Sequence, residues 1–413
     1  MNAVVGGEIV VFNIYLINLL RALSLALELS DGGLSRHHWR TAVVAERIAS
    51  HIALPPEQRQ TLIDATLLHD IGAASEWEEK KNLYNHQPVD NLYKHAETGY
   101  NLLKDSSHLK DLAGPIRHHH DRWDGTSPSG LTGRDIPLLA RIINLADSFE
   151  VLLEDDVFIF NQCETILEII TRLSKRQFDP TLVQALQEIA QKESFWLDLT
   201  NPHYYETFFQ DVSVHGRVRL DIDEIIEIAG IFATIIDWTS RFTASHSRDV
   251  SRIAAFLAQA KGYSNAEVKM MRIAGLLHDL GKLTVPKAIL EKPGKLTEQE
   301  FSVVKQHAYY TYRILNQIDG FGLIAEWAAY HHETLDGTGY PFRVDRGNFR
   351  LGSKIVAAAD VFTALTEHRP YRQGLGLQEV EDIMLNFVAD KKLDGDLVNL
   401  LLANKKMLLH SDK

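Results

Sequence analysis

The chain has 413 residues, of which 45% are hydrophobic and 24% are charged, an ordinary composition for a globular protein of two or three domains. Its formal net charge of -12 argues against broad nonspecific binding of duplex nucleic acid, which needs a basic face, although a few Lys and Arg side chains can still hold a phosphorylated ligand. The single cysteine, Cys163, excludes an intramolecular disulfide and favours the reducing cytoplasm.

The first apolar segment of the chain is IVVFNIYLINLL, residues 9–20. Twelve residues are too few to span a bilayer, and Glu8 stands where a signal peptide would have a basic flank. We therefore expect a buried or amphipathic helix here and no membrane span. Apolar helices expected over 9–30 and 224–243 are candidates for packing on each other or across a homodimer.

Most of the following chain has the periodicity of helices. Apolar residues recur three and four positions apart in AVVAERIASHI, TILEIITRL, RIAAFLAQA and EVEDIMLNFV. One stretch, SVHGRVRLDID at 213–223, alternates like a strand. The pattern predicts an all-α protein.

The sequence contains one plan twice. LLHDIG at 67–72 returns as LLHDLG at 276–281. Histidine pairs 32 and 24 residues apart recur in both halves: His37/His69 and His246/His278, then His95/His119 and His307/His331. We expect two tandem helical bundles, residues 1–200 and 222–413, joined by a linker at 201–221.

Histidines and aspartates that face a helical interior need a compensating partner, and divalent metal ions supply one. The second copy has His246, His278, Asp279, His307, His331, His332 and Asp360; the first has His37, His69, Asp70, His95, His119, His120 and Asp147. Imidazole and carboxylate without thiolate suit Fe, Mn, Ni or Zn. Seven ligands exceed the needs of one ion, so two ions are expected, with Asp279 bridging them. His38, His51 and His118 fall outside the matched spacings and are interpreted as surface or satisfied core histidines.

Four motifs of the second copy occur in a diagnostic order: HSRDV, LLHDLGK, HHETLDGTGYP and ADVFTALTEHRPYR. At these residues the copy resembles the HD-GYP family of bacterial cyclic-dinucleotide phosphodiesterases, and the first copy resembles the wider HD superfamily. The resemblance implies hydrolysis of c-di-GMP or 3′3′-cGAMP to a linear product by a hydroxide bridging two ions, with Fe or Mn favoured and Ni the alternative. The tandem arrangement resembles members that degrade 3′3′-cGAMP.

The resemblance also implies roles for single residues. Asp279 and Lys282 serve catalysis, and the substrate contacts are Gly339, Tyr340, Arg369 and Arg372. Gly339, Tyr340 and Pro341 form a rigid lip after the turn at Asp336 and Gly337. Glu333 is expected to support a ligand histidine, and Lys295 is a weaker candidate in the lid region 293–300.

Several positions depart from the family pattern. Phe242 stands where some members have a Glu for a third metal, which predicts two ions. HAYYTY at 307–312 is bulkier than usual, so it either changes the base pocket or repacks a helix. The first copy has Ala73 in place of Lys282, DGTSPSG in place of the lip and no RPYR. We expect it to support or regulate the second copy, with either a retained structural metal or relict ligands.

Two other functions compete with the phosphodiesterase. A non-catalytic module that binds a cyclic dinucleotide should have damaged ligands or a damaged lip, and the second copy has both intact. A phosphohydrolase of another HD type, acting on nucleotides or alarmones, would not need the Gly-Tyr-Pro lip or RPYR.

Overall fold

The computed structural model describes residues 2–5, 8–11, 14–30, 33–34, 36–73, 92–215, 218–239, 245–345, 347–367 and 374–409. The chain divides into two compact units. The N-terminal unit is Tyr15–Arg219, and the C-terminal unit is Leu220–Lys413 together with Met1–Ile14.

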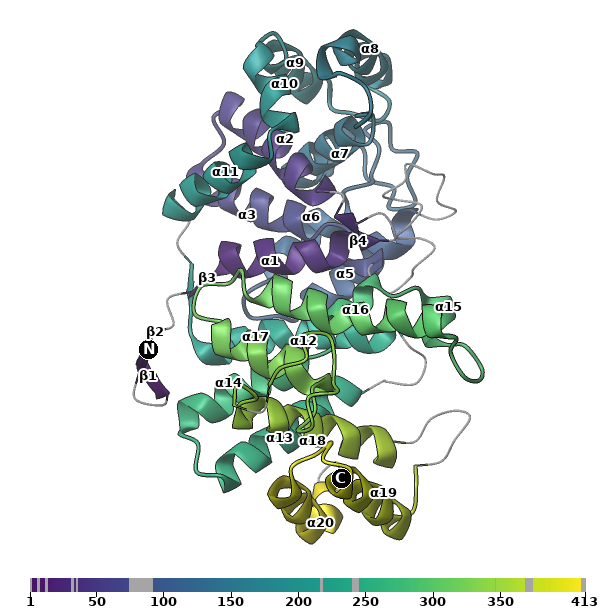
Figure 1. The fold of residues 1–413 in the computed structure, drawn as a ribbon. Helices are drawn as coiled ribbons and strands as arrows, with labels where there is room; N and C mark the ends of the chain where they lie inside the picture. Colours follow the sequence, from purple (N-terminus) through teal and green to yellow (C-terminus); the bar gives the residue numbers. More distant parts are fainter. Residues whose placement is uncertain are drawn as a thin grey trace. The chain divides into compact units, whose positions relative to one another are not determined.

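Helices make up most of the N-terminal unit, coloured purple to teal in Figure 1. Its α-helices are α1 (Leu16–Glu28), α2 (His37–His51), α3 (Pro56–Leu67), α5 (Leu92–Leu103), α6 (Lys110–Arg117), α7 (Leu138–Glu150), α8 (Cys163–Leu173), α9 (Pro180–Ile189), α10 (Glu193–Thr200) and α11 (Pro202–His215). Its short elements are β4 (Leu29–Ser30), β5 (Gly33–Leu34), η1 (Ile71–Ala73), η2 (Gly133–Asp135) and η3 (Ile159–Asn161).

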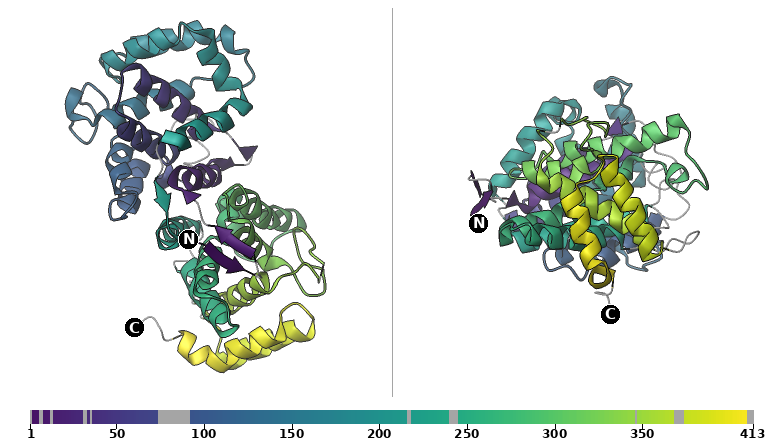
Figure 2. Two further views of the ribbon diagram at one scale, coloured as in Figure 1. Left: turned by 90° about the vertical axis from the view of Figure 1, so that its left-hand side faces the viewer. Right: turned by 60° about the horizontal axis from the view of Figure 1, so that its bottom comes forward.

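The C-terminal unit, coloured green to yellow in Figure 2, repeats much of this order. Its helices are α12 (Ile222–Trp238), α13 (His246–Ala260), α14 (Asn265–Leu277), η4 (Leu280–Thr284), α15 (Lys287–Leu290), α16 (Glu298–Leu315), α17 (Gly322–Ala329), η5 (Tyr330–His332), α18 (Leu351–Thr366), α19 (Leu377–Ala389) and α20 (Gly395–Leu409). The remaining strands are β1 (Asn2–Val5), β2 (Glu8–Val11), β3 (Ile14–Tyr15) and β6 (Arg219–Leu220).

Capping residues explain where the helices of the C-terminal unit start. Helices α12, α14 and α16 each begin at a capping box, in which an N-cap side chain and a Glu three residues later exchange hydrogen bonds with the backbone. The three pairs are Asp221/Glu224, Ser264/Glu267 and Thr297/Glu300. Each cap contributes about 1 kcal/mol, so helix starts are defined locally before the bundle packs.

The same packing recurs in both units. In the N-terminal unit α2 packs against α3 and α7, and in the C-terminal unit α13 packs against α14 and α18. The central helices bury matching apolar faces, including Val44 and Ile48 on α2 and Ile253 and Leu257 on α13. The predicted all-α fold is confirmed, because the strands form only short two-stranded sheets among the described residues. None of the described helices is both long and apolar enough to cross a membrane.

The segment expected to be a helix from residue 9 is different. Residues 8–11 form β2, which pairs antiparallel with β1, and the helix begins only at Leu16. The reason lies in the sequence: β-branched runs flank Gly6 and Gly7, a pattern typical of a hairpin. The strand expected over 213–223 is likewise shorter: among the described residues of this stretch only Arg219–Leu220 forms a strand, α11 continues to His215 and α12 begins at Ile222.

The stretch 201–221, expected to be a linker, contains a packed helix. Helix α11 contacts α1 and α2. Tyr205, Phe208 and Phe209 on α11 are buried, and the ring of Phe209 lies 5.2 Å from that of Trp39. Aromatic burial of this size holds α11 to the N-terminal unit.

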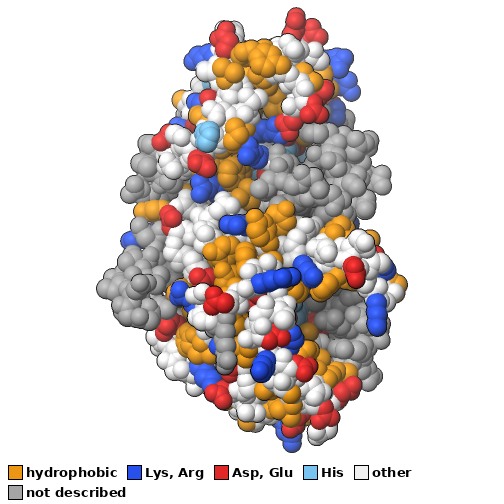
Figure 3. Space-filling view, viewed as in Figure 1, with side chains coloured by type: hydrophobic (Ala, Val, Ile, Leu, Met, Phe, Trp, Pro, Cys, Tyr) orange, Lys and Arg blue, Asp and Glu red, His pale blue; other side chains and the backbone are white. Residues whose placement is uncertain are grey.

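Charges of both signs are mixed on the face of the molecule drawn in Figure 3. Lys and Arg side chains alternate with Asp and Glu among the described residues of that face, without gathering into one basic stripe. This distribution agrees with the net charge of -12 and offers no broad phosphate-binding surface on that face.

One buried acid of α3 should make stability depend on pH. Asp64 is 4% exposed, accepts a hydrogen bond from Gln60 Nε2 at 2.9 Å, and has its pKa raised by burial to about 7. The matched position in α14 is the buried Ile273. Because the folded pKa lies above the ordinary value, the folded state loses stability as pH rises from about 4 to about 7.

The Asp64→Asn variant should remove that loss. In urea unfolding at pH 5 and pH 8, we expect the stability advantage of the variant to widen with pH, reaching about 1–3 kcal/mol at pH 8. An advantage that stays constant between the two pH values would contradict burial of an ionising Asp64.

Candidate metal centres

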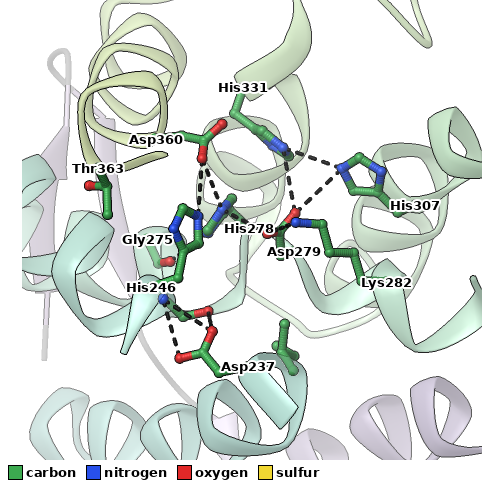
Figure 4. A network of polar contacts seen from close by, with 12 residues as sticks. Asp237, His246, Gly275, His278, Asp279, Lys282, His307, His331, Asp360 and Thr363 are labelled. Atoms are coloured by element: carbon green, nitrogen blue, oxygen red, sulfur yellow. Dashed lines mark hydrogen bonds and ion pairs between the residues drawn. The ribbon is translucent and has the colours of Figure 1, made fainter. Parts of the chain in front are cut away.

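The seven predicted ligand residues of the second copy converge on one place in the C-terminal unit (Figure 4, in which six of them are labelled). They come from the start of α13, the α14–η4 junction, α16, η5 and α18: His246, His278, Asp279, His307, His331, His332 and Asp360. Five are buried, and His332 and Asp360 are half-buried. The turn after α14 carries two of the seven in succession, so a single junction supplies the centre of the cluster.

Asp279 divides its two carboxylate oxygens between two groups of histidines. Its Oδ2 lies 3.2 Å from Nε2 of His278. Its Oδ1 lies 3.5 Å from Nε2 of His307 and 3.8 Å from Nε2 of His331. One carboxylate therefore faces both sides of the cluster, as a bridging ligand must.

Each side of the cluster is close enough to hold one ion. On one side, Asp360 Oδ1 lies 3.1 Å from His246 Nε2 and 3.8 Å from His278 Nε2. On the other, the Nε2 atoms of His307 and His331 face each other at 3.3 Å. The ligand atoms of His246, His278 and Asp360, and those of His307, His331 and His332, each lie within 4.8 Å of one another.

Backbone carbonyls orient the imidazoles. The Nδ1 atoms of His278, His307 and His331 lie 2.8, 2.6 and 2.6 Å from the carbonyl oxygens of Gly275, Val304 and Ala328, each three residues earlier. A proton held at Nδ1 leaves Nε2 with its lone pair toward the cluster, which is the tautomer that binds metal. The Nε2 atom of His278 is buried without a hydrogen bond in the described structure, as expected of a metal ligand.

The protonation states also suit metal binding. Burial lowers the pKa of His307 to about 4 and that of His332 to about 3. Burial would raise the pKa of Asp279, but the charges of His278 and Lys282 hold that pKa well below its ordinary value. Near neutral pH His307 and His332 are therefore neutral and Asp279 is ionised, which are the ligand forms of these groups. Burial would lower the pKa of His246, but its acidic neighbours Asp360 and Glu367 raise that pKa to about 10, so this imidazole must release a proton when it binds a metal ion.

The Gly-Tyr-Pro lip closes on the cluster from beside His332. The ring of Tyr340 stacks on that of His332 at 4.7 Å, and its backbone N–H donates to the carbonyl of His332 at 3.2 Å. A Cβ at Gly339 would lie 2.4 Å from the Cα of Glu333, so only glycine allows this approach. The peptide bond between Tyr340 and Pro341 is cis.

Two acids hold the lip in place. Glu333, 1% exposed, accepts hydrogen bonds from the backbone N–H groups of residues 342, 343 and 344 at 2.8–3.1 Å. Its expected support of a ligand histidine is therefore wrong, because the backbone after the lip uses both carboxylate oxygens. Asp336 shapes the turn as expected, since its Oδ1 accepts from the N–H of Thr338 at 3.1 Å and its Oδ2 from Lys392.

The predicted phosphate contacts are described only in part. Lys282 Nζ contacts Oδ2 of Asp279, at the edge of the cluster. Arg369 and Arg372 lie outside the described residues, as does Phe242. Lys295 is exposed in the segment between α15 and α16.

The residues that follow His307 on α16 make hydrogen bonds and ring contacts within the C-terminal unit. Thr311 Oγ1 accepts from the N–H of Gly281 at 2.9 Å and donates to the carbonyl of His278 at 3.1 Å. The ring of Tyr312 stacks on Tyr330 at 5.8 Å and meets Phe342 at 5.2 Å. These contacts support the alternative that HAYYTY repacks the helix, with Tyr309 left exposed.

The N-terminal unit contains a second cluster with the same geometry. It brings together all seven predicted residues, His37, His69, Asp70, His95, His119, His120 and Asp147. Asp70 Oδ2 lies 3.4 Å from His69 Nε2, and Asp70 Oδ1 lies 3.3 Å from His95 Nε2. The bridging position of Asp279 is therefore present here as well.

The matched spacing of the two copies did not identify every residue that lies in these clusters. His38, interpreted from sequence as an ordinary histidine, is fully buried and belongs to the group of His37, His69 and Asp70. Glu150 contacts Nδ1 of His37, and Glu367 Oε2 lies 3.5 Å from Nδ1 of His246. Glu150 follows the ligand Asp147 by three residues, whereas Glu367 follows the ligand Asp360 by seven. Comparing the two copies therefore does not pair these two acids.

Comparison of the two copies could have identified another pair of buried acids, Glu28 and Asp237. Glu28 at the end of α1 accepts a hydrogen bond from the N–H of His38, and Asp237 at the end of α12 accepts from the N–H of Ser247 at 3.2 Å. Both acids are buried. Glu28 and Asp237 are 209 residues apart, the same offset as His37 and His246 (237 − 28 and 246 − 37). Each acid thus caps the helix that begins with a ligand histidine.

Two all-α units with paired histidine–aspartate clusters define a class of protein suited to binding divalent metals. The chain belongs to the HD domain family, which matches residues 21–182 and 230–397.

Two relatives and one solved structure match between 69% and 96% of this chain. 3′3′-cGAMP-specific phosphodiesterase 1 of Vibrio cholerae serotype O1 is 33% identical over 379 residues, covering 90% of this chain and 87% of that protein. 3′3′-cGAMP-specific phosphodiesterase 3 of the same organism is 33% identical and covers 69% of this chain and 61% of its own length. The crystal structure of a cyclic GMP-AMP-specific phosphodiesterase of V. cholerae, V-cGAP3, matches 96% of this chain and 98% of its own at 25% identity, with a TM-score of 0.66.

Proposed function

We propose that this protein is a metal-dependent phosphodiesterase that opens a cyclic dinucleotide to its linear form, with the reaction in the C-terminal HD-GYP unit. The observation that carries the proposal is Asp279, whose two oxygens face two separate histidine groups at 3.2–3.8 Å. A bridged pair of ions is the arrangement suited to attack on a phosphodiester. The names of the relatives support the same class of substrate.

The residues divide between metal binding and substrate. His246, His278 and Asp360 would hold one ion, His307, His331 and His332 the other, and Asp279 both. When bound, the ions supply a nucleophile near neutral pH and clamp the phosphoryl group. Fe or Mn fits these ligands best, with Ni the alternative.

Charged and aromatic groups at the rim would hold the substrate. Lys282, in contact with Asp279 Oδ2, would offset the charge that develops on the phosphate as its bond to the 3′ oxygen breaks. Tyr340, stacked on His332, presents its ring beside the cluster, where a base can stack. Gly339 lets the lip approach, and Arg369 and Arg372 are proposed to bind phosphate through their planar guanidinium groups.

We favour 3′3′-cGAMP over c-di-GMP as the substrate. The relatives that cover most of this chain are named for 3′3′-cGAMP, whereas Cyclic di-GMP phosphodiesterase PA4108 of Pseudomonas aeruginosa covers only 34% of it. The match to 3′3′-cGAMP-specific phosphodiesterase 1 covers 90% of this chain and therefore includes both copies of the repeat, which supports this choice.

The two copies of the repeat would have different functions. We propose an N-terminal HD domain at about 1–200 and a catalytic HD-GYP domain at about 222–413, with α11 packed on the first. The N-terminal domain has Ala73 where the catalytic copy has Lys282, so it would bind metal without gripping a phosphate. A cytoplasmic location and a homodimer remain part of the proposal.

Product analysis tests the proposal directly. Protein loaded with Mn or Fe(II) is incubated separately with 3′3′-cGAMP and with c-di-GMP. The products are separated by chromatography and identified by mass spectrometry. We expect a linear dinucleotide that gains one water, formed faster from 3′3′-cGAMP. A faster reaction with c-di-GMP would reverse the substrate assignment alone. No product from either, with metal bound in the C-terminal unit, would favour the non-catalytic binding module.

A further inference from the structure

Helix α2 begins with two adjacent histidines, and both point into the N-terminal cluster. His37 Nε2 lies 3.3 Å from Asp147 Oδ1 and 3.2 Å from His69 Nε2. His38 is 0% exposed, and its Nε2 lies 3.7 Å from Asp70 Oδ2. The ligand atoms of His37, His38, His69 and Asp70 lie within 4.8 Å of one another.

The C-terminal unit places a different group at the matched oxygen. At the 209-residue offset, Ser247 replaces His38 and Lys282 replaces Ala73. There the Nζ of Lys282 contacts Asp279 Oδ2, the oxygen that also faces His278. Both bridging carboxylates thus have one extra nitrogen beside the same oxygen, an ammonium in one unit and an imidazole in the other.

The surroundings of His38 prepare it to bind a cation. The carboxylate of Glu28, fully buried at the end of α1, accepts a hydrogen bond from the backbone N–H of His38 and lies 3.5 Å from its Nδ1. The carboxylate therefore lies beside the ring nitrogen opposite the Nε2 that faces Asp70, where its negative charge favours the binding of a cation. In the C-terminal unit the matched acid, Asp237, bonds the hydroxyl of Ser247 instead.

We propose that His38 is an additional metal ligand of the N-terminal centre, which leaves this centre fewer open positions for water or substrate than the catalytic centre and makes it non-hydrolytic. The inference rests on the proposed function in one respect, that the N-terminal unit binds metal. The side of Asp70 that faces His69 then has five protein ligands: His37, His38, His69, Asp70 and Asp147. The corresponding catalytic side has four: His246, His278, Asp279 and Asp360. Catalytic centres keep a position open for water or substrate, whereas structural centres fill theirs with protein groups.

The inference is tested by substituting His38 in a protein that lacks the bridging carboxylate of Asp279. In the Asp279→Ala background, where metal at the C-terminal centre is disrupted, His38→Ser copies the residue of the matched position. His51→Ser on the same helix is the control, because His51 is exposed and paired with Glu188 at 2.9 Å. Each protein is loaded with Co(II), and the rate of metal loss to a chelator, the Co(II) absorption bands and the number of imidazoles by X-ray absorption are measured.

We expect His38→Ser to lose metal about 10–100 times faster, with one imidazole fewer per two-ion centre and shifted absorption bands. His51→Ser should match its parent. His38→Gln, which keeps a polar side chain in the buried position, should repeat the effect, so the result does not depend on one substitution folding well. Unchanged metal loss and imidazole number in a folded variant would overturn the inference and leave His38 as a buried residue whose backbone N–H is capped by Glu28. Since no substrate is involved, a failure of the proposed hydrolysis would not alter this outcome.

Discussion

Replacement of Asp279 by alanine should abolish the hydrolysis of the cyclic dinucleotide, reducing the rate by at least about a thousandfold, which corresponds to about 4 kcal/mol. The reason is geometric. Asp279 is the residue whose oxygens face both histidine groups of the C-terminal unit, and removal of its carboxylate leaves each group without its shared anion. Lys282 Nζ also loses the partner that holds it at the edge of the cluster.

Asp70→Ala is the matched control for this prediction. Asp70 has the same position in the N-terminal cluster, with oxygens 3.4 Å from His69 and 3.3 Å from His95. Metal content and initial rates of both variants should be measured together with their circular dichroism. We expect Asp70→Ala to lose metal from the N-terminal centre and to keep much of the hydrolysis. A folded Asp70→Ala protein that is as inactive as Asp279→Ala would show that the roles assigned to the two units are wrong.

The repeated spacing located both clusters because each ligand lies at a fixed place on a repeated set of helices. His307 on α16 and His331 on η5 are 24 residues apart along the chain, yet both face Oδ1 of Asp279, because α16 packs against η4, which follows Asp279, and against η5. A helix buries one face, so residues that recur at matched spacing end on matched faces. The all-α fold was predictable for the same reason.

Residues that occur in one copy alone could not be found by comparing copies. His38 was passed over because its counterpart is Ser247, and its burial depends on Glu28 from another helix. Glu333 was misjudged because it follows two ligand histidines in sequence, while the turn at the end of η5 directs its carboxylate to the backbone after the lip. The hairpin at the N-terminus was missed because an apolar run fits a helix and a strand equally well, and the preceding Gly pair was not weighed.

A single methyl group at Gly281 should damage the catalytic centre without replacing any ligand side chain. A Cβ there would lie 2.0 Å from the carbonyl oxygen of His307, so α16 or η4 must move. Because His307 Nε2 faces Asp279 Oδ1 at 3.5 Å, a shift of even 1 Å separates the two ligands of one ion, and misplacement on this scale costs up to about a hundredfold in rate. We expect Gly281→Ala to lower the rate of hydrolysis by about 10–100-fold and to reduce metal content.

Gly72 provides the matched control, because a Cβ there would lie 2.0 Å from the carbonyl oxygen of His95 in the N-terminal unit. The two variants place the same strain at the same position of the repeat, 209 residues apart. If hydrolysis depends on the C-terminal centre alone, Gly72→Ala should disturb only N-terminal metal binding and leave the rate within about threefold of the wild type, well short of the loss caused by misplaced catalytic groups. Equal losses of rate in the two folded variants would mean instead that catalysis needs both centres intact, and the N-terminal unit would then have to be counted as part of the catalytic machinery.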